Sequence, residues 1–325
     1  MQEQFIENLL KTDFPEIIGQ DRVKKQLKSA LLARRHVILV GPPGAGKTTL
    51  ARSVAKLLPP MRLTDDAFRQ LPTEDVKARE FSGEERFVRV QGSPDLTAED
   101  LLGDIDPMKA LEYGPLSVEA FSPGKIFKAN SGVLFFDEVN RCSDKLQNAL
   151  LQVLQEKIAT IGSYDVDFPA DFIFIGTMNP DDNSTEELSA VFLDRFDLIY
   201  VSYPENQEDE VAVVRSRAEM MCEFDEKLLA HTVRFVRGLR LDKNLERAPS
   251  VRASIGLVER ACANARIAGR KNVTLSDIHD AAHSVLAHRI ALKPSVRYVK
   301  SAQEYVSEEV ASFIEETKRL IGDSG

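Results

Sequence analysis

The feature that most limits the possible folds of this chain is a glycine-rich segment between an apolar run and a helical pattern. Residues 37–40 read Val-Ile-Leu-Val, residues 41–48 match G-x-x-x-x-G-K-[ST], and residues 49–58 have a helical pattern that ends at Pro59-Pro60. A phosphate-binding loop requires this order, because the strand carries the loop and the helix start adds N–H groups and partial positive charge. The sequence therefore predicts an α/β domain that binds a nucleotide.

The residue types in this segment have separate chemical reasons. The glycines let backbone N–H groups turn toward phosphate oxygens, because no Cβ blocks the approach. Lys47 is expected to reach the β- and γ-phosphates, and Thr48 is expected to ligate Mg²⁺. A Gly/Pro turn with a chance lysine is the alternative, and the flanking strand and helix disfavour it. The predicted nucleotide-contacting residues of the segment are Gly41, Pro42, Pro43, Gly44, Ala45, Gly46, Lys47, Thr48 and Thr49.

Composition narrows the classes of function. The 325 residues suffice for two domains. A net charge of −9 disfavours broad nonspecific nucleic-acid binding but leaves room for a local basic patch. Cys142, Cys222 and Cys262 lie far apart without a C-x-x-C pair, which indicates a reducing compartment and no zinc site. The first residues lack the pattern of a signal peptide, and no apolar run approaches the ~20 residues of a membrane span. We therefore expect a cytoplasmic protein without a membrane span.

A second motif is an apolar run that ends in two carboxylates, Gly-Val-Leu-Phe-Phe at 132–136 followed by Asp137 and Glu138. The pattern predicts a central strand whose carboxyl end meets solvent, where ligands bind in open α/β sheets. Asp137 is expected to hold Mg²⁺ through its water shell, and Glu138 is expected to polarise the attacking water. A strand that merely ends at an acidic turn is the alternative, which the preceding phosphate loop disfavours.

Two more polar residues adjoin predicted strands. Asn179 follows a buried strand over 172–177, where its amide could position the attacking water. Arg195 lies between a segment expected to be helical, 186–193, and the last predicted strand, 198–201. Its guanidinium is either presented to the γ-phosphate of a neighbouring subunit or is a surface salt-bridge partner, and the spacing leaves both open.

The rest of the first domain, expected to span 1–203, is predicted from local patterns. Residues 61–86 are interpreted as an exposed insertion in which 64–66 and 72–75 could each start a short helix. Residues 104–128 are rich in Gly and Pro and are expected to form turns or a small hairpin. Further expected elements are a helix over 21–34 that either is a plain N-terminal helix or lines the adenine, a strand over 87–90, a helical turn over 96–103, a helix over 144–156 and a hairpin over 158–168 that turns at Gly162-Ser163.

Beyond Pro204 the pattern is almost entirely helical, which predicts a second, all-α domain over 204–325. Ser250 is expected to cap a helix and to put Arg252 in its first turn, where a cation opposes the helix dipole and suits a role facing anions. Residues 274–277 match a capping box with Asp in place of Glu. The expected helices are 206–221, 225–238, 250–268, 274–290 and 303–321.

His279-Asp280-Ala281-Ala282-His283 imitates the zinc-protease pattern H-E-x-x-H. Asp280 is one methylene shorter than the required Glu, and no third ligand is evident nearby. We therefore expect ordinary helix histidines here.

The order of these motifs resembles the AAA+ ATPases and, within them, the MoxR branch of the helix-2-insert clade. The resemblance covers about residues 12–292. The segments that carry it are Gly41–Thr48, Asp137-Glu138-Val139-Asn140-Arg141, Thr177-Met178-Asn179-Pro180, Asp194-Arg195-Phe196 and residues 248–253.

This resemblance implies an ATP-binding α/β domain with a helical lid, working with Mg²⁺. It assigns Asn179 as sensor 1, Arg195 as the arginine finger and Arg252 as sensor 2. It places Ile18, Gly19 and Gln20 beside the adenine, and it interprets 104–128 as the helix-2 insert and 158–168 as the hairpin before sensor 1. Proteins of this type act as rings, commonly hexamers, because the finger serves the neighbouring site.

The implied function is an Mg²⁺-dependent ATPase whose ring motion remodels or activates a partner protein with a von Willebrand A domain, as a chaperone does. Residues 247–252 depart from the usual sensor-2 run, and the long 61–86 insertion is similar to that of the magnesium-chelatase ATPase subunit. The motor subunit of a metal-insertion complex therefore stays an alternative. A nucleotide-gated switch that hydrolyses ATP only weakly is another alternative. A DNA-associated motor is disfavoured by the excess of acidic over basic residues in the chain.

Overall fold

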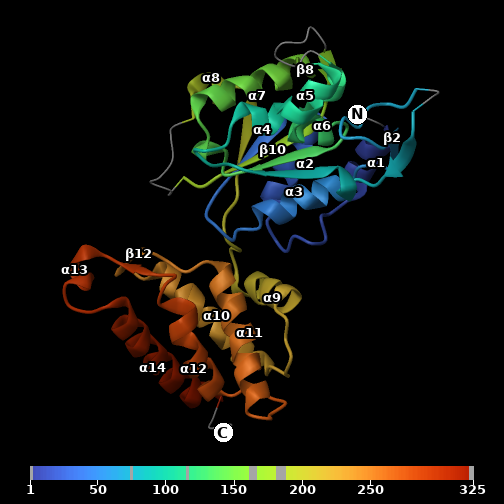
Figure 1. Ribbon diagram of the computed structural model, residues 1–325. Coiled ribbons are helices and arrows are strands. Elements are labelled where there is room, and N and C mark those ends of the chain that lie inside the picture. The colour runs from blue at the N-terminus through green and yellow to red at the C-terminus, as the bar shows by residue number, and fades with distance from the viewer. Residues whose placement is uncertain (1–2, 74–75, 115–116, 161–166, 181–187, 322–325) are drawn as a thin grey trace. The chain divides into compact units, whose positions relative to one another are not determined.

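The structure is a computed structural model that describes residues 3–73, 76–114, 117–160, 167–180 and 188–321 (Figure 1). The chain divides into two compact units, each described by itself. Unit 1 holds Met1–Ile17, Asp21–Pro42 and Gly46–Val201, and unit 2 holds Ile18–Gln20, Pro43–Ala45 and Ser202–Gly325.

Unit 1 is built on a parallel sheet of five strands, in the order β11-β1-β10-β7-β4. Each predicted strand is present, because apolar runs of four to six residues can be buried on both faces of a parallel sheet. Parallel pairing brings all five carboxyl ends to one edge of the sheet, and all five amino ends to the other. The strands are β1 (His36–Val40), β4 (Phe87–Gln91), β7 (Val133–Asp137), β10 (Ile173–Met178) and β11 (Phe196–Tyr200).

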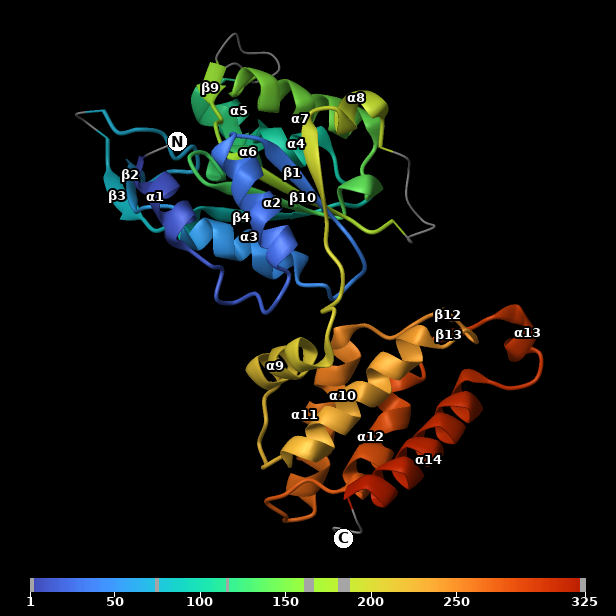
Figure 2. The ribbon, with the colours of Figure 1, turned by 180° about the vertical axis from the view of Figure 1, so that it is seen from behind.

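Helices cover both faces of this sheet. On one face, α7 (Asp144–Glu156) begins where it was predicted and contributes Leu146 and Leu150 to a core with Ile38 and Phe174. On the opposite face lies α3 (Lys47–Lys56), as Figures 1 and 2 show. The remaining larger helices of the unit are α1 (Glu3–Lys11), which the sequence patterns missed, and α2 (Asp21–Leu32).

The prediction of short helices in the 61–86 insertion is wrong. Residues from this stretch form an antiparallel hairpin of β2 (Met61–Thr64) and β3 (Ala78–Phe81), followed by the 3₁₀ turn η1 (Glu84–Arg86). Asp66 does not cap a helix, because its Oδ1 accepts the N–H groups of Phe68 and Arg69 in a turn. The second expected helix start at 72–75 lies partly outside the described residues, and its described part is not helical.

The hairpin expected within 104–128 is present, with β5 (Gly103–Ile105) paired to β6 (Phe121–Pro123). The preceding helical turn is α4 (Ala98–Leu102), which has a capping box at Thr97 and ends at Gly103, whose φ is 110°. Between the strands lies a helix that was not predicted, α5 (Pro107–Tyr113), because Asp106 caps it and Pro107 suits its first position. The shorter elements are η2 (Val118–Ala120) and α6 (Lys125–Lys128).

The last part of unit 1 follows the predictions where the structure describes it. The expected 158–168 hairpin has its strands in β8 (Ile158–Thr160) and β9 (Asp167–Pro169), and its turn at Gly162-Ser163 lies outside the described residues. Of the helix expected over 186–193, residues 186–187 also lie outside, and α8 (Ala190–Leu193) is the helical part, capped by Ser189.

Unit 2 is mainly helical, as predicted. Its capping box at Thr274 and Asp277 is present, and Arg270 forms two hydrogen bonds with the Asp277 carboxylate. Two short paired strands, β12 (Leu245–Arg247) and β13 (Ala291–Leu292), were missed, because so few residues give no alternation to read. The helices are α9 (Gln207–Arg217), α10 (Glu226–Leu241), α11 (Val251–Ile267), α12 (Leu275–Leu286), α13 (Pro294–Arg297) and α14 (Ala302–Ile321).

The two histidines of the zinc-like pattern have ordinary neighbours. His279 lies beside Asp280, and His283 Nε2 lies 2.8 Å from Ser307 Oγ. Among the described residues, no group of three or more His, Cys, Asp or Glu is placed to hold a metal ion. None of the helices described is both long and apolar enough to cross a bilayer.

Candidate nucleotide-binding site

The glycine-rich loop leaves the carboxyl end of β1 and leads directly into α3. Gly41 N–H donates to Met178 O at 3.0 Å, and a Cβ on Gly41 would lie 2.0 Å from Val201 O. Gly44 and Gly46 have φ angles of +78° and +91°, which L-residues with side chains rarely adopt. The backbone therefore favours glycine at all three positions, and this is the conformational freedom that a phosphate-binding loop uses.

Lys47 is the first residue of α3, two residues before the start that was predicted. Its ammonium donates to Gly41 O at 2.5 Å and to Pro42 O at 2.9 Å, so the positive charge lies over the loop. Thr48 and Thr49 follow in the first turn of the helix. The sequence-predicted set therefore comes together around the first turn of a helix, where backbone N–H groups lack helical partners.

The segment predicted to lie beside the adenine contacts this loop. Gln20 Nε2 donates to Ala45 O at 3.2 Å, and Gly19 and Gln20 both have positive φ. Gln20 Oε1 is buried without a hydrogen-bond partner among the described residues. Because buried polar atoms are normally hydrogen-bonded, this oxygen can accept a hydrogen bond from a further group beside the loop. The 18–20 segment thus lies against the glycine-rich loop.

Asp137 is the last residue of β7 and lies at the sheet edge from which the glycine-rich loop leaves β1. The strand register shows this, because Leu39 of β1 pairs with Thr177 of β10. On the other side of β7, Gln91 of β4 pairs with Asp137. Thr177 Oγ1 donates to Asp137 Oδ1 at 2.6 Å, and Arg89 Nη2 lies 2.6 Å from Asp137 Oδ2. Both oxygens of the carboxylate are therefore held in place. This orientation lets a short acidic side chain face the carboxyl edge of the sheet.

Glu138 follows in a left-handed backbone conformation with φ of 55°. Its N–H donates to Thr177 Oγ1 at 2.9 Å, and its Oε2 accepts from Gln91 Nε2 at 2.9 Å. Arg141, in the 3₁₀ turn η3 (Val139–Arg141), places Nε 3.3 Å from the same oxygen. The left-handed turn departs from the strand direction and aims the Glu138 carboxylate at the partners on β4 rather than along β7.

Arg89 and Gln91 contact the candidate carboxylates Asp137 and Glu138, and the sequence patterns did not single them out. Thr177 also contacts both residues, and it lies in a segment that carries the family resemblance. Arg89 and Gln91 lie two apart on β4 and so point to one face, a polar pair at the end of an otherwise apolar strand. That alternation was a usable signal. Their contact with Asp137 and Glu138 was not predictable, because it depends on β4 lying beside β7.

Asn179 lies at this edge and Arg195 does not. Asn179 directly follows β10, and its carbonyl accepts from Asn140 Nδ2 at 3.5 Å. Arg195 directly precedes β11, whose first residue Phe196 pairs with His36 at the start of β1. Strands rise ~3.3 Å per residue, and Arg195 lies level with Arg35, six residues before Gly41, so it is separated from the start of the loop by roughly 20 Å along the strands. It cannot contact a phosphate in its own loop.

At the amino edge, Arg195 has partners within its own unit. Its Nη1 lies 3.4 Å from Val191 O and 3.5 Å from Asp194 Oδ2. With the Gln155 amide turned so that its oxygen faces the guanidinium, Arg195 donates to that oxygen from Nε at 2.7 Å and from Nη2 at 2.8 Å. The side chain is thus held at the surface, with about a third of its area exposed.

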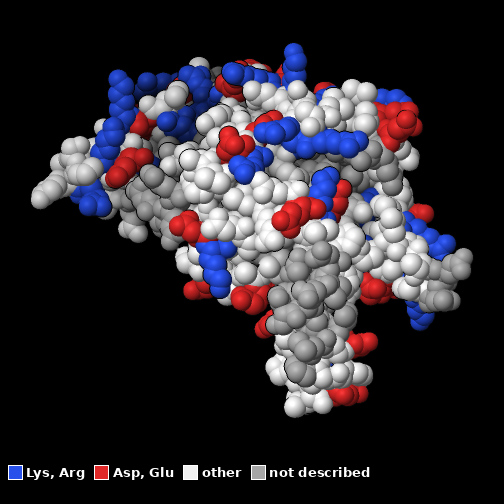
Figure 3. All heavy atoms as spheres, turned by 90° about the horizontal axis from the view of Figure 1, so that it is seen from above, with Lys and Arg blue, Asp and Glu red and all other residues white. Residues whose placement is uncertain are grey.

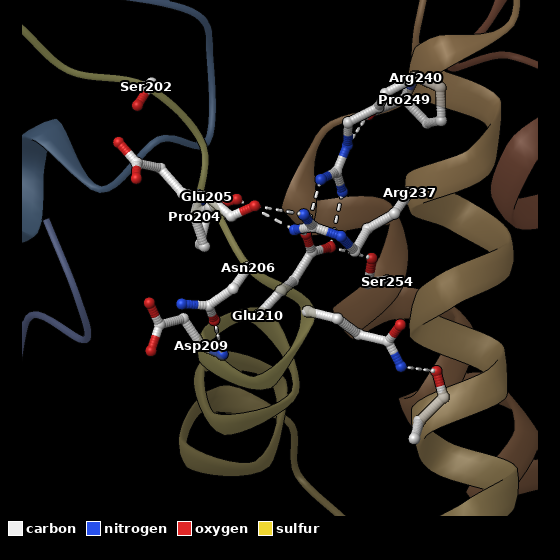
Figure 4. A network of polar contacts seen from close by, with 12 residues as sticks. Ser202, Pro204, Glu205, Asn206, Asp209, Glu210, Arg237, Arg240, Pro249 and Ser254 are labelled. Atoms are coloured by element: carbon white, nitrogen blue, oxygen red, sulfur yellow. Dashed lines mark hydrogen bonds and ion pairs between the residues drawn. The ribbon is translucent and has the colours of Figure 1, made fainter.

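Arg252 is the second residue of α11 in unit 2, as predicted, although Ser250 makes no side-chain capping bond. The start of this helix is tied to a buried carboxylate that was not predicted, Glu210 of α9 (Figure 4). Arg240 donates to both Glu210 oxygens at 2.6 and 2.7 Å, and also to Pro249 O at 2.8 Å. The carbonyl just before Ser250 is therefore fixed by the same arginine that pairs with Glu210.

Glu210 is ionised in this network. Burial opposes its charge, but hydrogen bonds and the charge of Arg240, together with Ser254 and Arg237, outweigh burial and lower its pKa. Arg237 also donates to Pro204 O and Glu205 O at 3.0 and 2.9 Å, so the network extends to the chain that enters unit 2. Removing Glu210 would leave two arginines facing each other without their counter-charge, which is the costly way to break such a network.

Comparison with known proteins gives the same assignment for both units. Residues 36–196 match the model of the AAA domain (dynein-related subfamily), and residues 246–309 match the AAA lid domain. The chloroplastic magnesium-chelatase subunit ChlI of Chlamydomonas reinhardtii is 30% identical over 86% of this chain and 76% of its own length. The uncharacterized protein YeaC of Bacillus subtilis is 26% identical over 92% and 90%. A mutant of RuvB from Thermotoga maritima is 19% identical with a TM-score of 0.52, covering 83% of this chain and 72% of that one, which shows the fold alone.

Proposed function

The chain belongs to the AAA+ family and is related to the magnesium-chelatase ATPase subunits, and from this premise we propose that it is an Mg²⁺-dependent ATPase that acts on a partner protein. One observation carries the proposal: the phosphate loop, Asp137, Glu138 and Asn179 all follow strands that end at one sheet edge. No single motif would suffice, but together they supply a phosphate cradle, oxygen ligands and a base.

The residues fit a nucleoside triphosphate with its metal. The loop 41–48 offers the cradle and Lys47, and the unpartnered Gln20 Oε1 can accept from a nucleobase amino group. Thr48 and Asp137 supply the hydroxyl and carboxylate oxygens that Mg²⁺ prefers. When bound, the ion would neutralise charge on the phosphates. Glu138 would take the proton of the attacking water, and Asn179 would orient that water.

We propose that Arg195 and Arg252 complete the site. Arg195 lies at the amino edge of its own sheet, so it can reach a γ-phosphate only in another subunit. This placement supports a ring, commonly a hexamer in this family, in which each subunit supplies a finger to its neighbour. Arg252 lies at the start of α11 and would act as sensor 2 in the lid, positioned by the Glu210–Arg240–Pro249 contacts.

The proposed client is a protein, with a von Willebrand A domain as the first candidate and remodelling, maturation or activation as the work done. The insert at 104–128 supports a protein contact, because α5 exposes Met108, Leu111 and Tyr113 by 75%, 84% and 52%. A nucleic-acid client is disfavoured, because the chain has a net charge of −9 and the face in Figure 3 carries Asp and Glu as well as Lys and Arg. Free cysteines support work in the cytoplasm.

A second candidate is the motor subunit of a magnesium-chelatase-like complex. The identity to a magnesium-chelatase subunit over most of both chains favours it. The two candidates differ in their partner, so the identity of the captured partner separates them. A third candidate is a nucleotide-gated switch that barely hydrolyses ATP. Steady-state phosphate release, measured with and without that partner, distinguishes the switch from the two motors.

The test is ATP binding and phosphate release by the purified chain with Mg²⁺, with Lys47→Ala as the matched variant. We expect binding at or below millimolar ATP that Lys47→Ala weakens strongly. Glu138→Gln charged with ATP should then retain the client during affinity capture, because an arrested motor does not release it. A folded wild-type chain that binds no ATP with Mg²⁺ at millimolar concentration would refute the proposal.

A further inference from the structure

A cavity of about 380 Å³ lies in unit 1 at the sheet edge opposite the phosphate loop. Its lining includes His36 at the start of β1, Gly132 just before β7 and Ile173 at the start of β10. Because the three strands are parallel, their amino ends face away from the edge that carries Asp137 and Glu138. The cavity is therefore separate from the proposed ATP site.

The cavity has apolar walls and a buried cation. Arg86 lines it and is only 2% exposed. The guanidinium donates to Ser82 O at 3.3 Å and also to Ser131 O and Pro59 O, while no described carboxylate contacts it. The apolar wall residues are Phe5, Leu31, Leu58, Pro59, Met61 and Phe172.

Arg86 has N–H groups left for a further hydrogen-bond acceptor. A guanidinium has five N–H groups, and three of them point at the carbonyl oxygens. Nη1 also lies 3.8 Å from Met61 Sδ, a weak acceptor. Burial lowers the pKa of Arg86, and the charge of nearby Arg69 lowers it further, so the protein bears a cost for this cation. An anion in the cavity would compensate that charge and take the remaining N–H groups.

The other charged lining residues reinforce the same preference. Arg34, Arg35 and Lys157 also line the cavity, and Asp171 is its one lining carboxylate among the described residues. Arg35 pairs with Asp197 at 3.1 Å, and Lys157 with Asp171 at 3.2 Å, whereas no described residue bonds to the Arg34 side chain. The described lining thus has four cationic side chains and one carboxylate. The cavity is therefore positively charged, although the chain as a whole has a net charge of −9.

His36 does not add to this charge. Burial lowers its pKa to about 4, and its Nδ1 accepts the N–H of Phe174 at 3.2 Å. The imidazole is neutral at physiological pH and extends the uncharged wall. The cavity thus combines a buried cation, a cationic rim and an apolar body.

We propose that this cavity binds a small organic carboxylate with an apolar body, its carboxylate directed at Arg86 and Arg34 and its hydrocarbon part against the apolar walls. The volume lies at the lower end of ordinary ligand pockets, about 300–1,000 Å³. Arginine forks match carboxylate geometry, and the apolar walls favour an organic anion over inorganic phosphate.

Isothermal titration with octanoate tests the proposal, with octanamide as the uncharged match and inorganic phosphate as a separate arm. We expect octanoate to bind at least about tenfold more tightly than octanamide, since hydrogen bonds to charged groups are the stronger ones. A saturating non-hydrolysable ATP analogue should leave octanoate affinity unchanged, so the result does not depend on the ATP site. Equal affinity for octanoate and octanamide, no binding, or tighter binding of phosphate would overturn the proposal.

Variants locate the site. Arg34→Glu should weaken octanoate binding about tenfold or more, and Arg22→Glu, an exposed arginine of α2 outside the cavity, should not. Leu58→Trp should abolish binding by filling the space from a half-buried wall position, without touching the buried arginine. Arg86→Met should also abolish binding if circular dichroism shows that it folds. Undiminished binding in both Arg34→Glu and Leu58→Trp would place the ligand elsewhere and reject the cavity.

Discussion

The two edges of the five-stranded sheet in unit 1 handle charge differently. At the carboxyl edge, Asp137 and Glu138 already have hydrogen-bond partners from the neighbouring strands. At the amino edge, the buried Arg86 contacts backbone carbonyls and Met61 Sδ but no carboxylate of a described residue. The charges at the first edge are compensated by neighbouring side chains, whereas Arg86 at the second edge has no counter-charge among the described residues. The two proposed sites would give one sheet two binding edges, of which one takes a cation and the other an anion.

The largest expected effect comes from Arg195, which lies at the amino edge but should serve a carboxyl edge. Arg195→Ala should lower turnover by about 10³–10⁵-fold, the range for an arginine finger, while ATP binding persists. Steady-state phosphate release and nucleotide titration measure the two effects. Lys145→Ala, an exposed cation of α7, is the control and should change neither.

Mixing two variants then tests whether Arg195 acts on the site of a neighbouring subunit. Arg195→Ala mixed with Glu138→Gln should recover part of the activity, because some interfaces pair an intact finger with an intact base. Full turnover by Arg195→Ala alone at all protein concentrations would mean that the amino edge takes no part in hydrolysis.

The next effect concerns the base at the carboxyl edge. Glu138→Gln should lower turnover by about 10²–10⁴-fold, since an amide cannot accept the proton of water. ATP affinity should hold, because Glu138 contacts Gln91 and Arg141 rather than the loop. Pre-steady-state phosphate release checks this, with Glu156→Gln at the end of α7 as the matched surface control. Turnover near the wild-type value would remove Glu138 from the chemistry.

The carboxyl edge was largely predictable from the sequence, because its residues directly follow apolar runs. Val133–Asp137 and Ile173–Met178 read as buried strands, and a polar residue at a strand end needs no knowledge of tertiary contacts. The sequence did not reveal that Arg89 holds Asp137, because that depends on which strand lies beside which. The roles assigned to the site residues stay predictions, and these residues are Lys47, Thr48, Asp137, Glu138, Asn179, Arg195 and Arg252.

The amino edge could not be predicted in this way. Its cavity combines residues from Phe5 to Ile173, and no local pattern links segments so distant in the chain. Arg86 looked like one charge among many in a polar stretch, yet the β2–β3 hairpin and η1 bury it. Glu210 was missed for the same reason, since a glutamate in the first turn of α9 resembles a solvated N-terminal residue.

His36 gives a pH test of the amino edge. Its pKa is about 4 in the folded chain and about 6.5 when unfolded, so below pH 6.5 the unfolded chain takes up a proton that the folded chain does not. Stability should therefore fall as the pH drops, by ~2 kcal/mol between pH 7.5 and 5 from this group. Urea unfolding at both pH values measures it. His36→Asn keeps an acceptor without titrating and should lose that part of the pH dependence; an unchanged slope would mean that His36 is not the buried neutral group.

The smallest expected effect tests whether Mg²⁺ can replace Arg89 as the partner of the Asp137 carboxylate at the carboxyl edge. Arg89 Nη2 lies 2.6 Å from Asp137 Oδ2, so Mg²⁺ must compete with a guanidinium for that carboxylate. Half of the Arg89 side chain is exposed, which limits the ion pair to about 1 kcal/mol or less. Arg89→Ala should lower the Mg²⁺ concentration for half-maximal turnover by up to about fivefold. Arg79→Ala is the matched control: Arg79 lies on β3 and forms ion pairs with Asp65 and Glu85, and its loss should leave the Mg²⁺ requirement unchanged. A higher Mg²⁺ requirement in Arg89→Ala would show that the arginine positions Asp137 for the metal, so that compensation at this edge is part of the site rather than a competitor for it.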